Sequence, residues 1–108
     1  MGTKNHKWID GKLLRTDKQF RHLKQRQREQ ISEWLYVQYC HLWMKKGHEP
    51  HKRNDWKVVA AVIEQIRNAE IWIPEWEVSK YFSNRKSHYR KRIEKELQAA
   101  QEQDGEQT

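Results

Sequence analysis

A shortage of aliphatic side chains is the feature that most limits what this chain can fold into. Leu, Ile, Val and Phe together supply only 20 of the 108 residues, and the net charge is +7, a balance that is typical of disordered chains. Six Trp and four Tyr residues compensate, because each large ring buries roughly 150–250 Å² when it enters a core. We therefore expect one small folded domain with an aromatic-rich core and a very polar surface.

The apolar residues recur at helical spacing. Segment 31–44 is apolar on most sides, which is typical of a central buried helix, and segment 54–68 has its apolar residues, Trp56 included, on one stripe. Segment 17–46 contains no Gly or Pro and is expected to form either one long helix or two helices with a bend near residues 28–31. The pattern predicts an all-α domain of four to five helices.

The expected organisation is a single helical domain over residues 7–98. Residues 1–6 are predicted to be a disordered tail, and residues 99–108 a fraying helix end followed by an acidic disordered tail. Asp10-Gly11 between apolar pairs indicates a short N-terminal β-hairpin. No apolar run approaches the roughly 18 residues of a membrane span, no hydrophobic signal region begins the chain, and Cys40 has no second cysteine to pair with. We expect a cytoplasmic protein without membrane contact.

Positive charge is concentrated in two blocks. Residues 1–28 hold nine Lys and Arg against two acids, residues 85–92 hold five bases and no acid, and residues 93–108 carry a net charge of −4. Clustered positive charge is typical of a surface that binds phosphate groups, although a solvated helix face gives the same pattern. In the first block, helical spacing places Arg21, Lys24 and Arg28 on one face. Lys18 precedes them and is a fourth candidate phosphate contact.

Residues 74–97 carry the most specific pattern in the chain. Val78 and Phe82 can form the inner face of one helix, Ser83-Asn84 a turn, and the residues from Arg85 onward a second helix with an opposite polar face. That arrangement resembles the general pattern of helix-turn-helix DNA-binding proteins. Ser83-Asn84 replaces the usual glycine and apolar residue, which leaves open that residues 74–97 form one helix or two helices at another angle. The resemblance implies that the second helix reads the major groove with its polar and basic side chains: Asn84, Arg85, Ser87, His88, Lys91 and Arg92.

Signatures of catalysis and metal binding are weak in this sequence. The four glycines are isolated, so no glycine-rich loop can hold a phosphate. Cys40 and His41 are adjacent, which points their side chains about 100° apart on a helix and fits a shared zinc ion poorly. We expect no metal, no cofactor and no enzymatic activity.

Two functional interpretations follow from these observations. The first is a non-enzymatic nucleic-acid-binding protein that binds duplex DNA, or RNA as a second choice, through both basic blocks. The second is a protein-interaction or adaptor module, or a homodimer, that uses exposed aromatic residues at its contact surface. The candidate contact residues for that module are Trp72, Trp76 and Tyr81.

Overall fold

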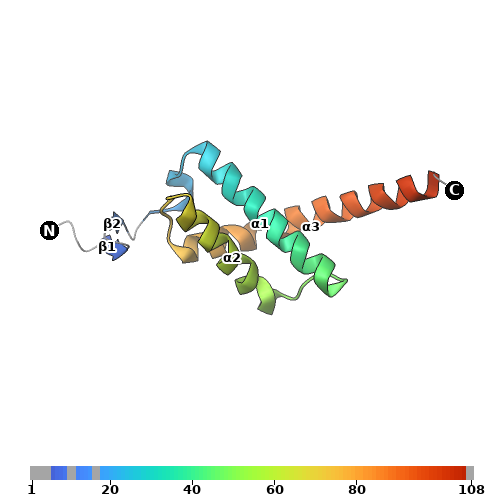
Figure 1. Cartoon of the computed structure of the whole chain (residues 1–108), viewed down its shortest axis with the longest axis horizontal. Helices are drawn as coiled ribbons and strands as arrows, with labels where there is room; N and C mark the ends of the chain where they lie inside the picture. The colour runs from blue at the N-terminus through green and yellow to red at the C-terminus, as the bar shows by residue number, and fades with distance from the viewer. Residues whose placement is uncertain (1–5, 10–11, 16–17, 107–108) are drawn as a thin grey trace.

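The computed structural model describes residues 6–9, 12–15 and 18–106, and its helices form a small bundle (Figure 1). The α-helices are α1 (Gln25–Lys46), α2 (Asp55–Asn68) and α3 (Glu75–Glu106). Two single-turn 3-10 helices precede α1 and α2, namely η1 (Phe20–His22) and η2 (Lys52–Asn54). The all-α character is confirmed. The expected count of four to five helices is not, because the described residues contain three α-helices.

Two short antiparallel strands lie apart from the bundle (Figure 1). They are β1 (His6–Ile9) and β2 (Lys12–Arg15), with Trp8 opposite Leu13. The Asp10-Gly11 turn of the predicted hairpin lies outside the described residues, as do residues 1–5 of the predicted tail. The hairpin as a whole therefore stays a prediction.

Helix α1 begins later than the sequence pattern predicts. Gln19, Leu23 and Lys24 have extended backbone conformations, so the break falls before Gln25 and not at the bend expected near residues 28–31. Residues 17–46 therefore form neither one long helix nor two helices joined there, but η1 and a helix that starts at Gln25. The side chain of Leu23 is only 4% exposed and belongs to the core. The extended link lets Leu23 enter the core, and the Lys24 N–H donates a hydrogen bond to Gln27 Oε1 (3.2 Å) at the start of α1.

Helix α3 is continuous through the predicted turn, so the helix-turn-helix interpretation of residues 74–97 is wrong. Val78, Phe82, Tyr89 and Ile93 are all buried, and their spacing of four, seven and four residues keeps them on one face of a single helix. The residues between them contain no Gly or Pro that would break the helix. Helix α3 also continues to Glu106, past the boundary expected at residue 98, and its end projects beyond the bundle (Figure 1).

Among the described residues the core is mostly aliphatic rather than aromatic-rich as expected: twelve of its sixteen buried side chains are Leu, Ile or Val, four are Tyr or Phe, and no described Trp is buried. Tyr39, Tyr89 and Phe82 are the largest fully buried side chains. Tyr39 meets Phe82 edge-on with ring centroids 5.6 Å apart, and Phe82 stacks on Tyr89 at 6.1 Å. Trp56 was expected on the buried stripe of the helix over 54–68, but it is 66% exposed. The core side of α2 is formed instead by residues such as Val58, Val59, Val62 and Ile66.

The buried tyrosines predict a loss of stability at alkaline pH. Burial raises the pKa of Tyr39 and that of Tyr89 to about 12 each, from an ordinary value of 10.0. The unfolded chain ionises first, so the stabilisation from these neutral hydroxyls is complete below about pH 10 and is lost as the pH rises toward about 12. The urea midpoint should fall over that range, and Tyr89→Phe should show a smaller fall. A midpoint that does not change with pH would contradict this prediction.

Candidate nucleic-acid interface

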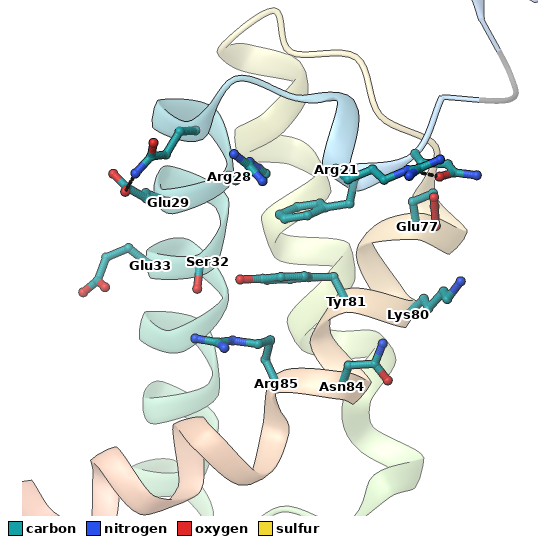
Figure 2. Close-up of a pocket in the computed structure, with 13 residues that line it drawn as sticks. Arg21, Arg28, Glu29, Ser32, Glu33, Glu77, Lys80, Tyr81, Asn84 and Arg85 are labelled. Carbon is teal, nitrogen blue, oxygen red and sulfur yellow. Dashed lines mark hydrogen bonds between the residues drawn. The ribbon is translucent and has the colours of Figure 1, made fainter.

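The two basic blocks meet at one cavity. A space of about 760 Å³ lies where η1 and the first half of α1 face the first half of α3 (Figure 2). Arg21 and Arg28 line it from the first block and Arg85 from the second, with Lys80 and Asn84 beside Arg85. Residues that are more than fifty positions apart in the sequence thus contribute to one surface. Sequence reasoning left open whether the two blocks lie close together.

Arg28 and Arg85 approach this space from different helices. Figure 2 shows the Arg28 guanidinium pointing in from α1 and the Arg85 guanidinium pointing back toward α1. The Nε atoms of both residues are buried and have no hydrogen-bond partner among the described residues. A buried N–H donor without an acceptor is costly, typically by about 1–3 kcal/mol. Tyr81 and Ser32 lie between the two guanidinium groups (Figure 2), so the two buried donors do not face one shared space.

An aromatic pair forms one wall of the cavity. Phe20 of η1 stacks on Tyr81 of α3, with ring centroids 3.9 Å apart and ring planes 19° apart. Nearby, the hydroxyl groups of Ser32 and Tyr89 are hydrogen-bonded at 2.8 Å. The stacking holds η1, and with it Arg21, against the start of α3.

Three carboxylates also line the cavity. Glu33 accepts two hydrogen bonds from the Arg92 guanidinium (3.0 and 3.2 Å), and Glu29 accepts one from Gln25 (2.9 Å). Glu77 is 9% exposed and lies on the Arg21 and Lys80 side, away from Arg28 (Figure 2). Because Arg92 compensates the charge of Glu33, the four bases of the lining exceed its remaining two carboxylates. The lining of the cavity is therefore net positive.

A polar and basic stripe runs along α3 from the mouth of the cavity. Its members are all exposed, share one helix face by their three- and four-residue spacing, and include no acid. This outer stripe of α3 spans roughly 16 Å at 1.5 Å per residue. It comprises Lys80, Asn84, Ser87, His88 and Lys91.

Three bases of the second block pair with acids elsewhere in the bundle instead. Lys86 pairs with Asp55 (2.9 Å) and Arg90 with Glu49 (3.4 Å). Arg92 pairs with Glu33 and Glu96 and lies 3.7 Å from the centroid of the Tyr36 ring; the hydrogen bond to Glu33 raises its pKa. Arg92 was predicted to bind nucleic acid, but its guanidinium is engaged in fixing α3 against α1.

The other predicted site residues are divided between the cavity and its surroundings. Arg21, Arg28, Asn84 and Arg85 share the cavity lining. Lys24 is exposed just before α1, and Lys18 is half-buried before η1. Ser87, His88 and Lys91 lie on the outer stripe.

Lys80 and Glu77 also line the cavity, although the sequence pattern indicates charge at the start of a helix and not part of a site. A single-helix interpretation of residues 74–97 would have placed Lys80 in line with Asn84, Ser87 and Lys91. The predicted turn at Ser83-Asn84 hid that alignment.

The three aromatic residues of the alternative interpretation have different environments. Trp76 is 60% exposed at the start of α3. Tyr81 is half-buried in the cavity wall under Phe20. Trp72 is half-buried between α2 and α3 and takes part in further interactions.

No family model, no curated protein and no solved structure matches this chain. Among the residues that the structure describes, no helix has the length and apolar character needed to cross a membrane. The same part of the chain contains no group of three or more His, Cys, Asp or Glu residues placed to hold a metal ion.

Proposed function

We propose that this is a non-enzymatic DNA-binding protein that places the outer stripe of α3 in the major groove of duplex DNA. The observation that carries the proposal is the meeting of two distant basic blocks at one cavity, from which the exposed stripe continues. In this arrangement Arg21, Lys24 and Arg28 lie beside α3 and contact phosphate groups at the edge of the groove. Arg85, in the lining of the cavity, contributes a further phosphate contact.

The chemistry of the stripe suits base and phosphate contacts. The major groove is about 12 Å wide and admits an α-helix, and a stripe of roughly 16 Å spans about five base pairs at 3.4 Å each. The Asn84 amide can bond an adenine edge in two places, and Lys91 can donate to guanine or to a phosphate. Duplex DNA is favoured over duplex RNA because the major groove of A-form RNA is too narrow for a helix.

A pair of charge-neutralising variants tests the proposal. Lys80→Gln with Lys91→Gln removes two positive charges from the stripe, whereas Lys45→Gln with Lys46→Gln removes two from the exposed end of α1. The affinity of the wild type for a short duplex should fall steeply with salt. The stripe variant should lose on the order of tenfold or more in affinity at low salt, and its salt slope should fall by about 2.

The α1 variant serves as the matched control and should keep most of the wild-type affinity and slope. Fluorescence anisotropy with labelled duplex DNA, duplex RNA and single-stranded DNA gives each value directly. Two results would defeat the proposal: no binding of wild type to any duplex at low salt, or equal losses in the two variants. Tighter binding to single-stranded DNA than to duplex DNA would mean that the protein binds single strands and not the major groove.

The protein-interaction alternative has less support from the geometry. Of its three candidate residues only Trp76 is largely exposed, since Tyr81 is stacked in the cavity wall and Trp72 is half-buried. A contact surface normally gathers several anchors around a buried centre. Among the described residues, Trp56 is the other Trp that is largely exposed, and single exposed apolar side chains are common on monomeric proteins and do not call for a partner.

A further inference from the structure

We propose that Asn84 gives the outer stripe of α3 a preference for adenine, so that the favoured duplexes carry an A·T pair at the position that faces Asn84. This inference rests on the proposed placement of the stripe in the major groove. It assigns base selectivity to one side chain, because phosphate contacts position a protein on the duplex without reading its sequence.

The Asn84 side chain is available for a base contact. It is exposed on α3, and Figure 2 shows its amide pointing away from α1, whereas the neighbouring Arg85 guanidinium reaches back toward α1. In the part of the chain that the structure describes, no hydrogen bond or ion pair engages the Asn84 amide. Its N–H donors and its carbonyl oxygen can therefore both bond a ligand.

The amide lies between the two lysines of the stripe. Lys80 lies four residues before Asn84 and Lys91 seven residues after it, roughly 6 Å and 10 Å along the helix axis at 1.5 Å per residue. Lysines that contact phosphate groups at the borders of the groove hold the side chains between them against the base edges. Asn84 is therefore placed in the part of the stripe that faces bases.

The chemistry of the amide matches adenine better than the other bases. In the major groove adenine presents an acceptor, N7, beside a donor, its N6 amino group, and the amide offers a donor and an acceptor that point the same way. Guanine presents two acceptors there, so the carbonyl oxygen of Asn84 would be desolvated without gaining a donor. The other stripe residues between the lysines are Ser87 and His88, and neither offers such a pair of groups.

Selection from a randomised duplex pool tests the inference. The wild type should enrich duplexes with an A·T pair at one fixed position, and replacing that pair by G·C should weaken binding roughly tenfold. Asn84→Ala should bind both duplexes equally and keep the wild-type salt slope, because the substitution removes no charge. Asn68→Ala truncates another exposed asparagine, at the end of α2, and should keep the wild-type preference. Circular dichroism verifies that both variants are folded.

An adenine analogue that carries C–H in place of N7 separates a direct base contact from the shape of the duplex, which also depends on sequence. The analogue removes one acceptor from the major groove and keeps the base pair. At the enriched position it should weaken binding of the wild type and leave binding of Asn84→Ala unchanged.

Three results would overturn the inference and leave the proposed DNA-binding function standing. They are duplex binding by the wild type without a preference for adenine, the same preference in the wild type and Asn84→Ala, and an equal effect of the analogue on both proteins. Absence of duplex binding at low salt would instead defeat the proposed function, and this inference with it.

Discussion

Replacing Ser83 with proline is expected to lower the free energy of unfolding by about 3 kcal/mol or more. Ser83 lies inside α3 and is exposed to solvent, so the substitution disturbs no core packing. Proline removes the N–H that bonds to the carbonyl one turn earlier, and its ring clashes with that carbonyl. Urea denaturation followed by circular dichroism measures the change.

The matched substitution at this position is Ser83→Ala. Alanine keeps the backbone N–H and has the higher helix propensity, so stability should rise by a few tenths of a kcal/mol. The pair distinguishes a helix interior from a turn, because a turn tolerates proline much better. An unchanged urea midpoint for Ser83→Pro would restore the turn at Ser83-Asn84 and with it the helix-turn-helix interpretation.

The error at Ser83-Asn84 shows how local and long-range signals compete in this sequence. Polar residues at these positions are equally consistent with a turn and with the exposed face of a helix. The buried residues carried the deciding information, because Phe82 and Tyr89 keep one helical phase across the supposed turn. The helical character of this segment could therefore be predicted, and its continuity could have been predicted from the same residues.

The start of α1 could not be predicted in the same way. Residues 17–24 contain no helix breaker, and their local preferences favour a longer helix. Tertiary contacts override that preference: Leu23 is buried in the core and Phe20 stacks on Tyr81, far along the chain. Neither contact has a local signature in the sequence.

The candidate site was predictable in its charge but not in its geometry. The blocks that contain Arg28 and Arg85 are visible in the sequence as clusters of positive charge. The sequence does not show which of these bases form ion pairs, because their acidic partners lie 31 to 59 residues away. Arg92 is the clearest case, since only the packing of α3 on α1 brings it to Glu33.

The ion pairs of Lys86, Arg90 and Arg92 connect α3 to the rest of the bundle. Exposed ion pairs contribute little stability each, about 0–1 kcal/mol, and of these three only Lys86–Asp55 is part-buried. The rotation of α3 about its own axis follows instead from its buried face, which holds Val78, Phe82, Tyr89 and Ile93. That rotation leaves Lys80 and Lys91 exposed to solvent, and the ion pairs are consistent with it.

The substitution Phe82→Ala is expected to have the largest effect on stability, a loss of about 3–5 kcal/mol. Phe82 is 1% exposed and contacts both Tyr39 and Tyr89. Removing its ring eliminates buried apolar area and leaves a cavity that two rigid aromatic neighbours cannot easily fill. Because small domains are typically stable by only about 5–15 kcal/mol, the variant should unfold at much lower urea concentrations than the wild type.

Two further substitutions serve as comparisons for Phe82→Ala. Phe82→Leu keeps much of the buried volume and should cost clearly less than Phe82→Ala. Trp56→Ala removes a larger ring that is 66% exposed and should change stability by about 0.5 kcal/mol or less. Similar losses for Phe82→Ala and Trp56→Ala would contradict an aromatic core at this position. Phe82 lies at the centre of a core whose other buried side chains are mostly aliphatic, so its loss should exceed that of any exposed ring.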